Sequence, residues 1–75
     1  NMDQRLQKMY RAAYAYHKRH DPPQDTPDYW EWAATDIGAV SSLHDNDPFI
    51  IGLLSAVYAE LERGYTRLLA EKESA

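Results

Sequence analysis

The chain of 75 residues has no cysteine, three glycines and one phenylalanine. Without cysteine, neither a disulfide framework nor a thiolate zinc site can stabilise the fold, which must then depend on packing. Three scattered glycines provide no glycine-rich loop that would bind phosphate. The longest apolar run, Phe49 to Leu54, is too short to cross a bilayer.

The composition is that of one small globular domain. Hydrophobic residues make up 44% of the chain and charged residues 27%, which are proportions of folded rather than disordered chains. A chain this short holds a single domain, predicted over residues 1–75. No charged segment followed by an apolar stretch resembles a secretory signal, so we expect a soluble cytoplasmic protein with no membrane association.

Charge is unevenly distributed along the chain. Five basic residues and one acid lie in residues 1–20, whereas nine acids and neither lysine nor arginine lie from Asp21 through Glu62. The net charge of the whole chain is −4. This polarity is compatible with a nucleic-acid face, with an acidic face for a partner, or with two halves that attract each other in the fold.

Three helices are predicted over about residues 3–20, 27–44 and 48–72, with no alternating apolar run that would indicate a strand. Asp21-Pro22-Pro23 ends the first helix, because proline lacks a donor and disfavours helical geometry before it. Thr26-Pro27 and Asp47-Pro48 are starts with a capping side chain followed by proline. Gly38 is a place where the second helix would bend or end early. The predicted fold is an all-α three-helix bundle.

Each helix has an apolar side at the 3.6-residue period. The first helix gathers Met2, Leu6, Met9, Tyr10, Ala13, Tyr16, His17 and His20. The second gathers Trp30, Ala33, Ala34, Ile37, Val40 and His44, with Tyr29 at the margin. The third gathers Ile50, Leu53, Leu54, Val57, Tyr58, Leu61, Tyr65 and Leu68, which is wide enough to contact two neighbours, so it is the predicted central helix.

The third helix is longer than the other two. Short connections make sequential helices antiparallel neighbours, so the last two turns of the long helix, with Leu68 and Leu69, are expected to extend beyond the bundle. Either the first helix is offset along the bundle and covers them, or a second chain does. Small bundles often dimerise to complete a core, so we predict a homo-oligomer, in the simplest case a homodimer, with another protein as the alternative partner.

Aromatic residues suggest a second contact surface. The chain has six tyrosines and two tryptophans. Trp32 points away from the core side that Trp30 occupies, and tyrosine and tryptophan dominate protein–protein contact sites. The interaction residues predicted from the sequence are Tyr14, Tyr29, Trp32, Leu43, Leu68 and Leu69.

Two alternatives concern nucleic acids. The basic side of the first helix could follow phosphates, although no helix-turn-helix is recognisable and a solvated surface explains the same pattern. Its residues are Arg5, Lys8, Arg11, Lys18 and Arg19. The acids from Asp21 to Glu62 could instead imitate DNA and inhibit a nucleic-acid-binding protein, in which case they would cluster on one exposed surface.

No catalytic or metal centre is predicted. His17, His20 and His44 are the candidate zinc ligands, but the HExxH spacing is absent and packed histidines bonded to a carbonyl or carboxylate explain them. Asp36 has no local structural role, and we expect it to pair with the basic first helix. The sequence therefore predicts a protein that is not an enzyme, with no cofactor, no metal and no small-molecule substrate.

Four segments carry a resemblance to known proteins, namely Thr26-Pro27-Asp28-Tyr29-Trp30, Asp36-Ile37, Asn46-Asp47-Pro48-Phe49 and residues 53–63. The pattern resembles small helical proteins of unknown activity carried by phages, prophages and conjugative elements of Gram-positive bacteria. The resemblance implies a cytoplasmic accessory protein of a mobile element and assigns no functional residue. We predict a non-catalytic protein–protein interaction module that self-associates.

Overall fold

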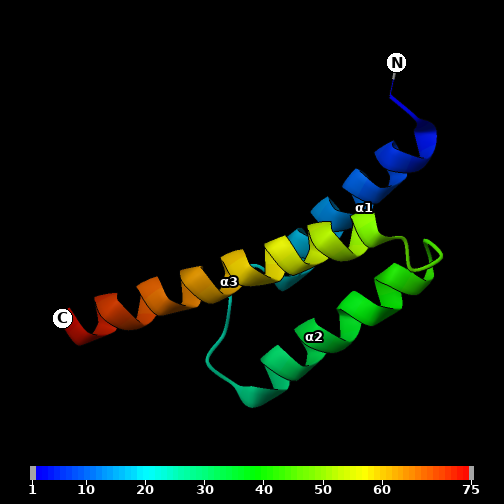
Figure 1. Ribbon diagram of the computed structural model, residues 1–75. Coiled ribbons are helices and arrows are strands. Elements are labelled where there is room, and N and C mark those ends of the chain that lie inside the picture. The colour runs from blue at the N-terminus through cyan, green and yellow to red at the C-terminus, as the bar shows by residue number, and fades with distance from the viewer. Residues whose placement is uncertain (1, 75) are drawn as a thin grey trace.

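The computed structural model describes residues 2–74, which form α1 (Gln4–His20), α2 (Pro27–Ser42) and α3 (Pro48–Ser74), with no strand in that range. α1 and α3 run in the same direction and α2 runs against both (Figure 1). α3 contacts both other helices. The predicted all-α bundle with a long C-terminal helix is confirmed, while the predicted domain ends at residues 1 and 75 lie outside the described residues.

Side chains cap the helix starts as expected. Thr26 Oγ1 accepts a hydrogen bond from Tyr29 N at 3.2 Å, and Asp47 Oδ1 accepts one from Phe49 N at 2.9 Å. Each cap satisfies an N–H group that has no partner within the helix. The two predicted starts with proline are therefore confirmed.

The end of α2 differs from the prediction. The helix continues through Gly38 and ends at Ser42, two residues before His44. Asp45 and Asn46 then adopt left-handed backbone angles, with φ of 57° and 54°. Aspartate and asparagine tolerate this conformation better than most residues, which confirms the turn but places its start earlier than the periodicity suggests.

The core lies along α3, where both shorter helices pack. Buried apolar side chains come from all three helices and form one cluster, namely Met9, Ala13, Tyr16, Val40, Ile50, Leu54 and Leu61. α1 and α2 approach α3 more closely than they approach each other. The predicted central position of the third helix is confirmed.

Four side chains differ from their predicted environment. Met2, Tyr10 and Ala34 are exposed rather than in the core, and Tyr29 is 6% exposed rather than marginal. Tyr29 turns inward because its hydroxyl donates to His20 O at 2.5 Å. Ala33 is fully buried on the same helix, whereas Ala34 lies in solvent.

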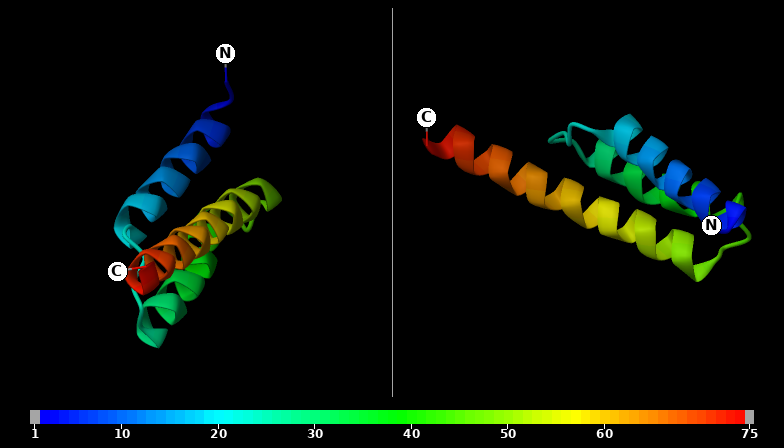
Figure 2. Two further views of the ribbon diagram at one scale, coloured as in Figure 1. Left: turned by 90° about the vertical axis from the view of Figure 1, so that its left-hand side faces the viewer. Right: turned by 90° about the horizontal axis from the view of Figure 1, so that it is seen from above.

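α1 and α3 begin level with each other. An exposed ion pair joins their starts, with Arg5 Nη1 3.3 Å from Asp47 Oδ2. α3 has 27 residues and α1 has 17, and the difference corresponds to about 15 Å of helix. The right-hand view of Figure 2 shows the C-terminal part of α3 running past α1 and α2. The first helix is not offset to cover it.

Candidate functional site

Residues 66–74 of α3, which we call the projecting segment, continue the line of the core without a cover. Leu68 follows Leu61 by seven residues and Ile50 by eighteen, so the three side chains share one side of the helix at about 100° per residue. Ile50 and Leu61 are buried, but Leu68 is 40% exposed. Leu69 beside it is half-buried. The segment therefore presents apolar surface that no other part of the described chain covers fully.

The loop between α1 and α2 packs against α3 just before the projecting segment begins. Pro23 packs near Gly64, where an added Cβ would lie 3.6 Å from Pro23 Cγ. The Tyr65 hydroxyl donates to Asp25 Oδ1 at 2.5 Å. The hydrogen bond to Asp25 raises the pKa of Tyr65 above its ordinary value of 10.0, with burial adding to the effect. The two residues are 40 positions apart, and no local sequence pattern links them.

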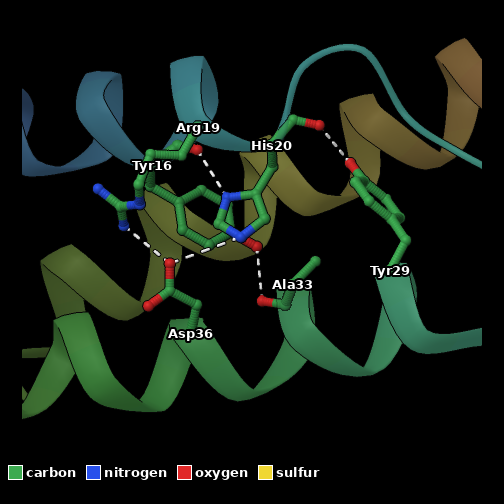
Figure 3. A network of polar contacts seen from close by, with 6 residues as sticks. All are labelled: Tyr16, Arg19, His20, Tyr29, Ala33 and Asp36. Atoms are coloured by element: carbon green, nitrogen blue, oxygen red, sulfur yellow. Dashed lines mark hydrogen bonds and ion pairs between the residues drawn. The ribbon is translucent and has the colours of Figure 1, made fainter.

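A buried polar network joins the end of α1 to α2 (Figure 3). The Tyr16 hydroxyl donates to Ala33 O at 2.8 Å, and His20 Nδ1 lies 2.8 Å from Tyr16 O. Burial, followed by the negative charge of Asp36, raises the pKa of Tyr16 from 10.0 to about 12. The sequence places Tyr16 and His20 on the apolar side of the first helix but does not indicate the hydrogen bonds that they make.

Asp36 closes the network at its exposed edge. Its Oδ2 lies 2.8 Å from Arg19 Nη2 and 3.5 Å from His20 Nε2 (Figure 3). The predicted pairing of Asp36 with the first helix is confirmed. The His20 ring is buried and stacks on Trp32 with centroids 3.8 Å apart. His20 is thus a packed histidine bonded to a carbonyl, as the sequence suggested.

Of the predicted contact residues, only Tyr29 and Trp32 are seen in ring contact within the described chain, with centroids 6.0 Å apart. Trp32 is 47% exposed and has His20 against its ring. Tyr14 is exposed with Lys18 Nζ 5.4 Å from its ring centroid. Leu43 is 81% exposed and lines a shallow groove of about 250 Å³ between α1 and α2. Tyr29 is buried and does not reach this surface, which corrects its placement among the contact residues.

Two of the five basic residues of α1 form ion pairs with acids of the same chain. Arg5 and Arg19 pair with Asp47 and Asp36. Lys8, Arg11 and Lys18 make no ion pair within residues 2–74; Lys18 instead lies over the Tyr14 ring. The five residues therefore do not act as one unpaired basic surface.

The three histidines are not assembled into a metal site. His20 lies against Trp32 near the start of α2, and His44 follows the end of that helix, about 18 Å further along its axis. Within the described part of the chain, no three or more histidine, aspartate or glutamate side chains come close enough to hold a metal ion.

Neither helix hydropathy nor similarity to known proteins assigns a function to this chain. None of the helices within residues 2–74 has both the length and the hydropathy that crossing a membrane requires. The chain matches no protein family, no curated protein and no solved structure.

Proposed function

We propose that this protein is a small non-catalytic interaction module that associates with itself through the projecting segment of α3. The observation that carries the proposal is the position of Leu68. It lies on the side of α3 that holds the buried Ile50 and Leu61, yet it is 40% exposed. Burying a leucine side chain fully is favourable by roughly 1.5–3 kcal/mol. A surface that covers Leu68 and Leu69 would recover part of that free energy.

The size of the chain supports this proposal. With 75 residues and no cysteine, the bundle has little packing to spare and no covalent crosslink. At the start of the projecting segment, the α1–α2 loop reaches Gly64 through Pro23 and Tyr65 through Asp25. A second chain can supply the missing cover without a change in the fold.

The polar network supports a structural rather than a catalytic role for its members. The hydroxyl groups of Tyr16 and Tyr29 both donate to backbone carbonyls inside the bundle. Asp36 is paired with Arg19. These groups are already engaged, so the proposal does not include an acid–base reaction.

The alternatives involving nucleic acid have less support. Arg5 and Arg19 each pair with a carboxylate of the same chain, and the same contacts occupy Asp47 and Asp36. These ion pairs leave fewer basic side chains free to bind nucleic acid. They also leave fewer acidic side chains free to imitate DNA. A gel-shift assay at low salt tests the basic surface, since retardation lost in a K8E/R11E variant would favour it.

The self-association is tested by one substitution and a matched control. Leu68→Asp places a carboxylate at the proposed contact between two chains. Dimerisation would bury this carboxylate without a partner, which is unfavourable, so the variant is expected to be a monomer. Ile51→Asp changes a side chain of the same helix with the same exposed fraction, 40%, and is expected to leave association intact.

The measurement is size-exclusion chromatography with light scattering, with circular dichroism to confirm that each variant is helical. For the unchanged chain we expect a mass that rises with concentration above 8.7 kDa. A constant mass of 8.7 kDa would overturn the proposal. Equal effects of the two substitutions would show that the projecting segment is not the contact surface.

A further inference from the structure

We infer that two copies of this chain pair through antiparallel projecting segments, so that Lys72 of each copy reaches Asp25 of the other. The inference rests on the proposed self-association and specifies its geometry. It assigns a partner to two charged side chains that have incomplete contacts in the single chain.

The uncovered side of the projecting segment is apolar at its start, and one turn later it carries Lys72, which stands between Glu71 and Glu73. Lys72 follows Leu68 by four residues, so the two side chains lie on neighbouring positions of one helix side. Lys72 makes no ion pair with any residue in the range 2–74. A covering surface should therefore offer an apolar contact to Leu68 and, one turn away, a carboxylate to Lys72.

The same chain holds such a carboxylate one turn before Leu68. Tyr65 precedes Leu68 by three residues, and its hydroxyl fixes Asp25 through Oδ1 at 2.5 Å. Asp25 Oδ2 makes no hydrogen bond or ion pair within the described chain. Asp25 is exposed, and no lysine or arginine lies from residue 21 through residue 62 that could neutralise it locally.

An antiparallel pair of segments brings the two groups together. If Leu68 of one copy faces Leu68 of the other, a residue one turn after Leu68 in one helix lies beside a residue one turn before it in the second. Lys72 of the second copy then comes level with Tyr65 and its bound Asp25. A parallel pair would instead place the two Lys72 side chains beside each other, which is unfavourable.

The occupant of this surface is a second copy because the contact is self-complementary. Both the cation and the carboxylate belong to one chain and lie on opposite sides of Leu68 along α3. A two-fold axis at Leu68 repeats the ion pair and closes the assembly at a dimer. The right-hand view of Figure 2 shows that the segment extends beyond the ends of α1 and α2.

A charge exchange on the full chain tests this geometry. The variants are Lys72→Glu, Asp25→Lys and the two combined, compared at low salt by sedimentation equilibrium. Because a two-fold dimer contains the ion pair twice, we expect each single reversal to weaken dimerisation roughly tenfold. The combined variant should recover most of that loss.

A control with the same net charge separates the local contact from general electrostatics. K72E/D45K reverses an exposed aspartate in the α2–α3 turn, at the opposite end of the bundle from Asp25, and should not recover dimerisation. Recovery in K72E/D25K alone supports the antiparallel contact. If neither double variant recovers while Leu68→Asp still gives a monomer, the inference fails and the proposed function stands. An unchanged chain that is monomeric overturns both.

Discussion

At the scale of single residues, Tyr16 makes the stability of the bundle depend on pH. Its ring is buried and its hydroxyl donates to Ala33 O. Burial is the main reason that the pKa of Tyr16 rises from 10.0 to about 12. The folded protein therefore holds this proton more tightly than the unfolded chain does, which stabilises the folded state while the phenol stays neutral.

We expect this stabilisation to be complete below pH 10 and to be lost as the pH rises from 10 to 12. The loss should approach about 3 kcal/mol in the free energy of unfolding, since a tenfold change in an ionisation constant corresponds to about 1.4 kcal/mol. Urea unfolding followed by circular dichroism between pH 8 and pH 11.5 measures it.

The Tyr16→Phe variant is the control for this pH dependence. It should be less stable than the unchanged chain at pH 8 by about 1 kcal/mol, the net value of one hydrogen bond. Its stability should then fall less steeply above pH 10. Some decline remains, because Tyr29 and Tyr65 also have raised pKa values. An identical slope in both proteins would contradict the assignment to Tyr16.

Residue environments were predictable from the sequence where the helical period decides them. Met9, Leu54 and Leu61 are buried as that period indicates. Tyr29 is not explained by periodicity, because its hydroxyl bonds to the carbonyl of His20 across the α1–α2 loop. A hydrogen bond between separate helices depends on how they pack, which a single helical pattern does not contain.

At the scale of helices, the cap of α2 gives a direct test of its start. Thr26→Ala removes the acceptor for Tyr29 N and should lower the free energy of unfolding by about 1 kcal/mol. Thr35→Ala removes the same side chain from an exposed position within α2 and should change stability by less than about 0.5 kcal/mol. Urea unfolding of both variants checks the difference, and equal losses would show that the cap is not responsible.

Helix starts were more predictable than helix ends. A capping side chain followed by proline is a local signal, and both such starts are present at Pro27 and Pro48. The end of α2 at Ser42 depends on the left-handed pair Asp45 and Asn46, which turns the chain toward α3. The residue types in that turn do not determine where the helix before it ends. A prediction from the apolar period alone therefore extends the helix to His44.

At the scale of the whole molecule, the projecting segment should make thermal stability depend on protein concentration. A dimer is stabilised by mass action, so the unfolding temperature should rise as the concentration increases. The Leu68→Asp variant should show no such rise. Circular dichroism melting over a hundredfold range of concentration measures the effect, and a constant unfolding temperature in the unchanged chain would argue against self-association.

The helix lengths predicted a mismatch between α3 and α1, but not where the extra length appears. The starts of α1 and α3 lie level, where Arg5 pairs with Asp47, so the whole difference emerges at the C-terminal end. This register depends on how buried side chains of α1 pack against those of α3, which lie far away in the sequence. The sequence therefore left open whether α1 or a second chain covers Leu68, and the structure excludes α1.

The central position of α3 also has a consequence for the order of folding. α2 and α3 are joined by a short turn, so their packing closes only a small loop, whereas α1 must find α3 across 42 residues. The entropy lost on closing a loop grows with its length. We therefore expect the α2–α3 hairpin to form early and to present the side of α3 on which α1 docks.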